Sequence, residues 1–274
     1  MIEYNAHVLS SFWSRVLKFS VPSSALRLRK SLEEYIEAVC VEASDREELA
    51  IRGIQEYLQI RRGSAATRSI FLIGSLHVEI PDEVMEHPKV ESLTVKCMDL
   101  VVIHNDLYSY NFERKHGIHG HNLITAIMKE KRLDIQGSFN YAGKMFQQIG
   151  TAFLQDIKRI PKFGSKVDKA LHFHLEVMCN WIIGMEEWTF RSERYFGKQR
   201  FEVRRTRTVE LAPEPLRRQY DLMMDHLNTV SKTSDLTSMS RVIIRATGLD
   251  SLLRFTVPIA IYYCFTLLIY NVRN

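Results

Sequence analysis

Three polar side chains recur at steps of four in the segment NDLYSYNFE: the amide of Asn105, the hydroxyl of Ser109 and the carboxylate of Glu113. On an α-helix each such step turns only about 40° beyond a full turn, so the three groups share one face. They continue the apolar stripe of Met98 and Val102, which we expect to face the core. Burying these polar groups is costly unless each finds a partner. The face therefore predicts a binding partner.

Oxygen donors of this kind suit a hard divalent cation. Magnesium takes few protein oxygens and shares the rest of its shell with water and substrate phosphate. One carboxylate, that of Glu113, is too little charge for a closed protein cage, so the predicted site would be completed by a phosphate-bearing substrate. The spacing alone leaves a second interpretation open, a solvated helix end with Glu113 beside Arg114 and Lys115.

The elements that must position these groups are helices. With 12 glycines and 7 prolines in 274 residues, a fold of many short strands is disfavoured, and apolar residues recur at threes and fours. Ser23 or Ser24, and then Ser44 or Asp45, are expected to cap the first two helices, and Gly117 to end the long one. The sequence predicts an all-α fold with helices over 23–43, 45–60, 80–88, 89–115, 121–132, about 133–160 and 167–188.

Composition limits the partners and the compartment. The formal charge of +5 is modest and its basic residues are dispersed, which indicates a local anion site and no nucleic-acid surface. No cysteine pair has metal-ligand or disulfide-framework spacing, and MIEYNAHVLSSFW is unlike a secretory signal. We therefore expect a cytoplasmic protein with free thiols. Nothing in the sequence indicates the oligomeric state.

The composition changes near Leu211, so we expect a helical domain over 1–210 and a separate tail over 211–274. The tail ends in an uncharged segment, Phe255 to Tyr270. That segment is a little shorter than the roughly 20 residues that span a bilayer. Two interpretations stay open, a self-packing helix and a C-terminal membrane anchor.

NDLYSYNFE resembles the (N/D)DxxSxxxE metal motif of class I terpene synthases, of the fungal, basidiomycete-type sesquiterpene cyclase kind. YLQIRR at 57–62 resembles the helix end that carries the family's diphosphate-sensing arginine. WTFRSERYFG at 188–197 resembles the family's late aromatic segment with its RY pair. The three motifs follow in the right order over approximately residues 10–210. The resemblance implies a class I terpenoid synthase α-helical bundle.

The resemblance also implies a reaction, in which three magnesium ions hold a linear prenyl diphosphate and loss of diphosphate starts cyclisation. Farnesyl diphosphate is the expected substrate and a sesquiterpene the expected product. Asn105, Ser109 and Glu113 would ligate one of the magnesium ions. No side chain is assigned as a catalytic acid or base, since the released diphosphate can take the proton.

Further roles follow from the same resemblance. Arg62, with Arg61 as the less favoured choice, would bind the diphosphate, as would Arg194 and Tyr195. Aromatic faces would stabilise the carbocation through their quadrupoles. The candidates for that role are Tyr108, Trp181, Trp188 and Phe190.

Some family features are not recognised. The aspartate-rich motif is expected on an earlier helix, but the acidic cluster found in that stretch, DREE at 45–48, is interpreted as the first turn of a helix. The bundle is therefore expected to be incomplete at its N-terminus. A glycine after the sensor arginine is replaced by Ala65 or Ala66. The alternative function is a non-catalytic remnant, membrane-attached through residues 255–270.

The segment HGIHGH carries His116, His119 and His121 in the turn after the metal motif. Its glycines and the lack of a nearby cysteine or second carboxylate disfavour a zinc site. We expect a solvated loop.

Overall fold

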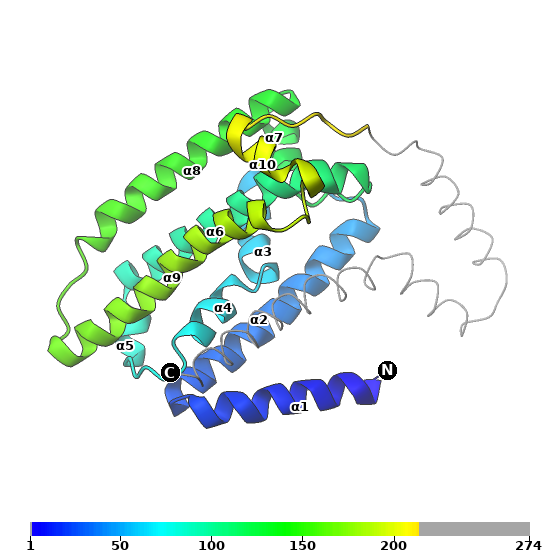
Figure 1. Ribbon diagram of the computed structural model, residues 1–274. Helices are drawn as coiled ribbons and strands as arrows, with labels where there is room; N and C mark the ends of the chain where they lie inside the picture. The colour runs from blue at the N-terminus through cyan, green and yellow to red at the C-terminus, as the bar shows by residue number, and fades with distance from the viewer. Residues whose placement is uncertain (1, 214–274) are drawn as a thin grey trace. The chain divides into compact units, whose positions relative to one another are not determined.

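The computed structural model describes residues 2–213 of the 274-residue chain, and every regular element in that range is a helix (Figure 1). The all-α expectation is confirmed. In chain order the elements are α1 (Ile2–Phe19), α2 (Pro22–Glu47), α3 (Ile54–Ser64), α4 (Thr67–Gly74), α5 (Asp82–Met85), α6 (Pro88–Lys115), α7 (Leu123–Lys131), α8 (Ile135–Ile157), α9 (Ser165–Arg191), the 3-10 turn η1 (Gly197–Gln199) and α10 (Arg200–Thr206).

The long helix that carries NDLYSYNFE is the best predicted element. It spans Pro88–Lys115 and stops before Gly117, which adopts a left-handed φ of 71°, as glycines at helix C-termini do. α5, α7, α8 and α9 also lie where the sequence pattern predicts helices, with ends shifted by a few residues. The pattern predicts neither α1 nor α4.

The predicted start of the second helix, near residue 45, is wrong. α2 continues through Asp45 to Glu47, and α3 does not start until Ile54. The Asp45 carboxylate caps no helix, because it accepts two hydrogen bonds from the Arg52 guanidinium at 2.6 and 2.7 Å. DREE at 45–48 is therefore the last turn of α2 and the start of a loop, not an acidic first turn.

The predicted caps of the first long helix are also wrong. α2 begins at Pro22, so Ser23 and Ser24 lie inside it, and Ser44 lies inside its last part. Proline is favoured at the first position of a helix because its missing N–H is not needed there. The Ser24 hydroxyl instead donates to the carbonyl oxygen of Val78 at 3.2 Å.

The described residues divide into two compact units. Unit 1 contains the described residues up to Ala38, together with Leu58–His104 and Gly143–Glu186. Unit 2 contains Val39–Tyr57, Asn105–Ala142 and the described residues from Glu187 onward. α6 therefore contributes its first part to unit 1 and its motif-bearing part to unit 2.

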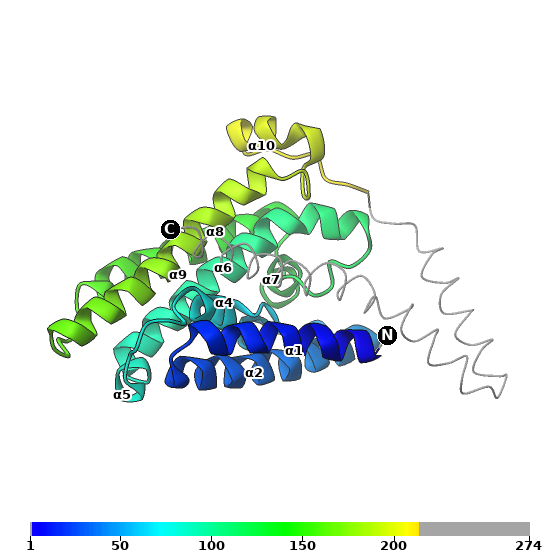
Figure 2. The ribbon, with the colours of Figure 1, turned by 60° about the horizontal axis from the view of Figure 1, so that its bottom comes forward.

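Unit 1 is built around one hydrophobic core. α1 runs antiparallel to the first part of α2 (Figure 2). The core itself joins α4, α5, α6, α8 and α9, and each large buried side chain contributes about 1.5–3 kcal/mol. Its buried members are Phe71, Ile80, Val84, Val90, Leu93, Cys97, Met98, Val101, Phe153, Leu171, Leu175 and Met178.

Two small residues shape the break between α3 and α4. A Cβ atom on Gly63 would lie 2.6 Å from the Cβ of Ala38, so the approach of α3 to α2 requires glycine there. Ala66 has φ 53° and ψ 19°, a left-handed conformation that costs an L-residue about 1–2 kcal/mol. Of the two alanines that the sequence analysis placed at a family glycine, Ala66 is the one in the glycine conformation.

We predict opposite effects for glycine at the two alanines of this break. Ala66→Gly removes the left-handed strain, which offsets the entropic cost of glycine, so the free energy of unfolding should stay unchanged or rise by up to about 1 kcal/mol. Ala65→Gly is the matched control, since Ala65 has no positive φ, and should lower it by about 0.5–1 kcal/mol. Urea unfolding of both variants measures the difference. A larger loss for Ala66→Gly than for Ala65→Gly would contradict the assignment.

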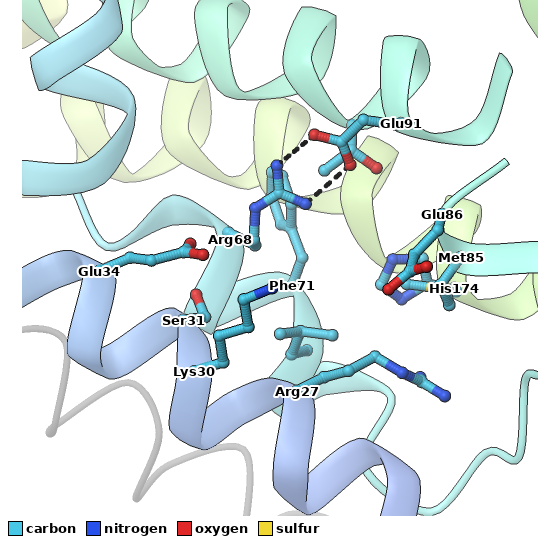
Figure 3. A pocket seen from close by; sticks show the side chains of 12 residues that line it. Arg27, Lys30, Ser31, Glu34, Arg68, Phe71, Met85, Glu86, Glu91 and His174 are labelled. Carbon is cyan, nitrogen blue, oxygen red and sulfur yellow. Dashed lines mark hydrogen bonds and ion pairs between the residues drawn. The ribbon is translucent and has the colours of Figure 1, made fainter. Parts of the chain in front are cut away.

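A buried histidine lies in unit 1. His174 is 1% exposed, and its Nδ1 lies 2.7 Å from the hydroxyl of Ser75. Burial, together with the charges of Arg27 and Arg68, lowers the pKa of His174 from 6.5 to about 4. His174, Arg27 and Arg68 line a cavity of about 280 Å³, where Arg68 and Glu91 form a two-pronged ion pair (Figure 3). His174 is therefore neutral near pH 7.

This neutral histidine predicts a pH dependence of stability. Between pH 6.5 and about 4 the unfolded chain binds a proton at this side chain and the folded protein does not, so the free energy of unfolding falls as the pH falls through this window. The full loss is about 3 kcal/mol and levels off below pH 4. Urea unfolding from pH 7.5 to 4 should show a shallower fall in His174→Gln than in the unsubstituted protein.

The control is His172→Gln, because His172 is 73% exposed and lies two residues away on the same helix. This variant should keep the pH dependence of the unsubstituted protein. Equal slopes in all three proteins would show that His174 does not titrate as expected.

Candidate active site

The three polar side chains of NDLYSYNFE lie on the part of α6 that belongs to unit 2. Ser109 is 3% exposed, and its Oγ has no hydrogen-bond partner among the described residues. Leaving a buried hydroxyl unsatisfied costs about 1–3 kcal/mol. Most buried polar groups are paired, so this oxygen calls for an explanation.

Glu113 is held by a residue of the next helix. Its Oε2 accepts a hydrogen bond from Nδ2 of Asn122 at 2.9 Å. Asn122 is fully buried and caps α7, with its Oδ1 accepting from the backbone N–H of Ile124 at 2.9 Å. The carboxylate of Glu113 therefore has a fixed neighbour within unit 2.

Asp106, the second residue of the motif, has a structural role. It is 1% exposed, and its Oδ2 accepts from the hydroxyl of Tyr57 at 2.5 Å and from the backbone N–H of Leu123 at 3.0 Å. Both partners belong to unit 2, one at the start of α3 and the other at the start of α7. This carboxylate thus ties two neighbouring helices to α6.

The RY pair lies beside the motif. Nδ2 of Asn105 donates a hydrogen bond to the hydroxyl oxygen of Tyr195 at 2.8 Å, across a sequence separation of 90 residues. The guanidinium of Arg194 lies 5.9 Å from the ring centroid of Trp188 and 5.4 Å from that of Tyr195, within the range of cation–π attraction. The structure therefore brings together the motif and the pair that the sequence analysis assigned to metal and diphosphate.

Three of the four predicted cavity aromatics lie in unit 2, and two of them share a cluster. Phe190 is fully buried and stacks on Phe196 with ring centroids 5.7 Å apart, while the ring of Tyr108 meets Phe190 edge-on at 5.3 Å. Arg207 donates to the Tyr108 hydroxyl at 2.6 Å. Trp188 contacts the ring of Tyr195 at 5.8 Å.

The chain beyond α10 runs along α6. After Arg207, the backbone carbonyl of Glu210 accepts from Asn111 at 3.1 Å, and the backbone N–H of Ala212 donates to Oδ1 of Asn111 at 2.7 Å. Arg114 donates to the carbonyl oxygen of Ala212 at 2.9 Å. The last described residues are thus fastened to the motif-bearing helix.

Arg62 and Trp181 belong to unit 1, whereas the other predicted site residues belong to unit 2. Nε and Nη2 of Arg62 donate to the two carboxylate oxygens of Asp99 at 2.7 and 2.9 Å. Trp181 on α9 packs, partly buried, against the hydrophobic core of unit 1. The roles expected of both side chains stay predictions.

The cavity of Figure 3 contains none of the predicted site residues. Six of the twelve residues that line it are charged, which differs from the apolar, aromatic cavity that the resemblance implies. The charged side chains that line it are Arg27, Lys30, Arg68, Glu34, Glu86 and Glu91.

The histidine segment is not the wholly solvated loop that the sequence predicts. His116 is exposed, but His119 is half-buried. The side chain of His121 is 10% exposed, with its Nε2 3.4 Å from Glu42 and its ring 5.0 Å from that of Tyr57. Within residues 2–213 no three His, Cys, Asp or Glu side chains are grouped so that they could hold a metal ion.

Magnesium fits the donors that the motif offers. An amide, a hydroxyl and a carboxylate are hard oxygen ligands, and the buried hydroxyl of Ser109 has no partner among the described residues. With one carboxylate, such a set needs further oxygens from water or substrate to complete a shell. Asn105 and Glu113 each have a hydrogen bond that orients the ligand group.

The sequence analysis did not single out Asn122, although a signal was present. An asparagine directly before the apolar run LITAI is a typical N-cap pattern. No comparable signal identifies Tyr57 as the partner of Asp106, or Asp99 as the partner of Arg62, because long-range pairs leave no local pattern.

Comparison with known proteins identifies the family. Residues 4–149 match the family model of terpene synthase family 2, C-terminal metal binding. The chain is 36% identical over 200 residues to Delta(6)-protoilludene synthase of Hypholoma sublateritium, covering 73% of this chain and 61% of the relative. It is 34% identical over 204 residues to sesquiterpene synthase 6 of Postia placenta, covering 74% and 59%. The chain belongs to terpene synthase family 2.

Solved structures share the fold. The crystal structure of a-eudesmol synthase aligns with a TM-score of 0.59 at 23% identity, covering 66% of this chain and 60% of that one. Germacradien-4-ol synthase from Streptomyces citricolor aligns with a TM-score of 0.57 at 23% identity, covering 66% and 59%. The chain spans about three fifths of the length of the curated relatives above.

The sequence leaves a membrane anchor open for residues 255–270. No helix between residues 2 and 213 is long and apolar enough to cross a bilayer. Phe255 to Tyr270, and nearly all of the tail expected over 211–274, lie outside the described residues.

We predict that Asn105 and Tyr195 are energetically coupled. Tyr195→Phe removes the hydroxyl oxygen that accepts the 2.8 Å hydrogen bond, and Asn105→Ala removes the donor. A double-mutant cycle on urea unfolding should give a coupling of about 1 kcal/mol. Tyr110→Phe is the control, because the Tyr110 hydroxyl lies 3.7 Å from the sulfur of Met128 and should be additive with Asn105→Ala. Additivity in both cycles would contradict the contact.

Proposed function

We propose that this protein is a terpene synthase that uses magnesium to ionise and cyclise a linear prenyl diphosphate, with farnesyl diphosphate as the substrate. The observation that carries the proposal is the buried hydroxyl of Ser109, which has no hydrogen-bond partner within residues 2–213. It lies on one helix face between an amide and a carboxylate that are each held by a hydrogen bond. Family membership supports the reaction class, and curated relatives are named sesquiterpene synthases.

Asn105, Ser109 and Glu113 would hold one magnesium ion. The bound ion supplies Lewis-acid stabilisation of the negative charge that develops on the leaving diphosphate. Tyr195 orients the amide of Asn105, and Asn122 holds the carboxylate of Glu113, so two of the three groups are positioned before the ion arrives. Such preorganisation avoids rearrangement during the reaction.

Arg194 and Tyr195 would bind the diphosphate next to that ion. The guanidinium of Arg194 lies over the rings of Trp188 and Tyr195, which restricts its position. Its fork of N–H donors matches the oxygens of a phosphate group. Arg62, in unit 1, keeps the diphosphate-binding role that the resemblance implies, and its guanidinium is held by Asp99. Bidentate donors of this kind suit phosphate oxygens.

The aromatic side chains would enclose the carbocation. Tyr108 and Trp188, both in unit 2, would offer ring faces and no strong nucleophile. Phe190 is fully buried and would act by packing against the ring of Tyr108. Trp181, in unit 1, keeps the role that the resemblance implies. Excluding water from such a cavity prevents early quenching of the cation.

The direct test is turnover. The purified full chain is incubated with farnesyl diphosphate and magnesium, and the volatile products are analysed by gas chromatography. A cyclic sesquiterpene whose formation falls about 100-fold or more in Glu113→Gln supports the proposal. Absence of any product from C10, C15 and C20 prenyl diphosphates would contradict it and favour a non-catalytic binding protein.

We predict that Ser109→Ala separates stability from binding. Removing a buried hydroxyl that has no partner should raise the free energy of unfolding of the metal-free protein by about 1 kcal/mol. The same change should reduce the thermal stabilisation given by magnesium with inorganic diphosphate, because a ligand oxygen is lost. Differential scanning fluorimetry measures both effects.

The control is Thr67→Val, because Thr67 in unit 1 is 2% exposed and its hydroxyl likewise has no partner in the part of the chain that the structure describes. It should stabilise the metal-free protein and leave the magnesium effect unchanged. If Ser109→Ala lowers the stability of the metal-free protein, the hydroxyl has a partner within the fold and the argument fails.

A further inference from the structure

Asn122 makes more contacts than helix capping requires. It is 0% exposed and immediately precedes α7, where its Oδ1 accepts from the backbone N–H of Ile124 at 2.9 Å. Serine, threonine or aspartate could accept the same hydrogen bond. What they lack is the amide NH2 group, which offers two N–H donors to other groups.

Both of these donors reach back to α6. Nδ2 of Asn122 donates to Oε2 of Glu113 at 2.9 Å and to the backbone carbonyl of Asp106 at 3.1 Å. The side chain therefore joins two points of the motif that lie about two helical turns apart. All three polar contacts of this amide are within unit 2.

The start of α7 reinforces this link. The backbone N–H of Leu123 donates to Oδ2 of Asp106 at 3.0 Å, so consecutive residues of the α7 N-terminus bind both carboxylates of the motif. The N-terminus of a helix carries a partial positive charge, which favours carboxylates beside it. Asp106 is fixed through its backbone and side chain, and Glu113 is fixed through its carboxylate.

We propose that Asn122 is a positioning residue for the magnesium site, and that it holds the carboxylate of Glu113 in place to receive the cation. This rests on the proposed function for the role of Glu113 as a ligand. Residues that hold a metal ligand from behind typically change metal affinity by about 10- to 100-fold when they are replaced. Asn122 would act through Glu113 and would not touch the metal or the substrate.

Asn122→Ser separates positioning from capping, because serine can still cap α7 but cannot donate to Glu113. Mn²⁺ takes the same oxygen ligands as Mg²⁺ and has an electron paramagnetic resonance signal that disappears on binding. In the full-length chain with inorganic diphosphate, Asn122→Ser should bind Mn²⁺ about 10- to 100-fold more weakly than the unsubstituted protein. Equal Mn²⁺ affinity in the two proteins would overturn the proposal.

Ile127→Val is the matched control. Ile127 is 0% exposed on the same helix α7, and its shortening lowers stability without touching the carboxylates of the motif. Mn²⁺ affinity should be unchanged in this variant. A comparable loss in Ile127→Val would show that any destabilisation of α7 weakens the site, and would overturn a specific role for Asn122.

A metal-free measurement distinguishes failure of this inference from failure of the proposed function. A double-mutant cycle of Asn122→Ser with Glu113→Ala, read from the urea midpoint without metal, should be non-additive, while Ile127→Val with Glu113→Ala should be additive. If the unsubstituted protein binds no Mn²⁺, the proposed metal site is wrong. The double-mutant cycle then tests the link between Asn122 and Glu113 by itself: non-additivity supports the link, and additivity overturns it.

Discussion

The constraint on which the site depends is that a helix buried along most of its length must find a partner for each polar side chain it carries. α6 meets this constraint repeatedly: Asp99 pairs with Arg62, and Asp106 accepts from Tyr57 and Leu123. His104, which is 5% exposed, lies 3.0 Å from a carboxylate oxygen of Glu186. Each pair also joins α6 to another helix of the same unit.

The hydroxyl of Ser109 has no such partner among the described residues, although the polar side chains of Asp99 and Asp106 on the same helix do. A hydroxyl is the easiest polar group to satisfy, since it can rotate to donate to a carbonyl one turn earlier. Here it does not, although Thr94 on the same helix does so, with its Oγ1 donating to the carbonyl oxygen of Val90 at 3.1 Å. A buried polar group without a partner calls for an explanation, and a bound cation supplies one for Ser109.

Local patterns in the sequence were sufficient for most of the helices and insufficient for the long-range partners of their side chains. α6 follows from apolar residues at threes and fours and a terminal glycine, which are properties of the segment itself. The boundary between α2 and α3 does not follow from the local pattern. Asp45 is of a residue type that often caps helices, but its carboxylate accepts two hydrogen bonds from Arg52 instead. That choice depends on a loop whose path the local pattern does not specify.

The same division applies to the site. Asn105, Ser109 and Glu113 can be selected from their spacing, since one helix places all three. Tyr195 contacts Asn105 from 90 residues away, and only the resemblance to a family brought it into consideration. Asn122 could be recognised as a helix cap from the local sequence, but that pattern does not indicate that its amide donates to Glu113.

The two arginines expected at the diphosphate are held by different forces, and this bears on how each can act. Arg62 is fixed by a carboxylate, which neutralises its charge and occupies two of its nitrogens. Arg194 lies against the aromatic faces of Trp188 and Tyr195, which orient a guanidinium without cancelling its charge. A guanidinium that already donates to a carboxylate has fewer of its five N–H donors left for a phosphate, so Arg62 would bind with its remaining donors in an orientation that Asp99 fixes. Arg194 belongs to the same unit as Asn105, Ser109 and Glu113, and its contacts with two aromatic rings orient its guanidinium within that unit.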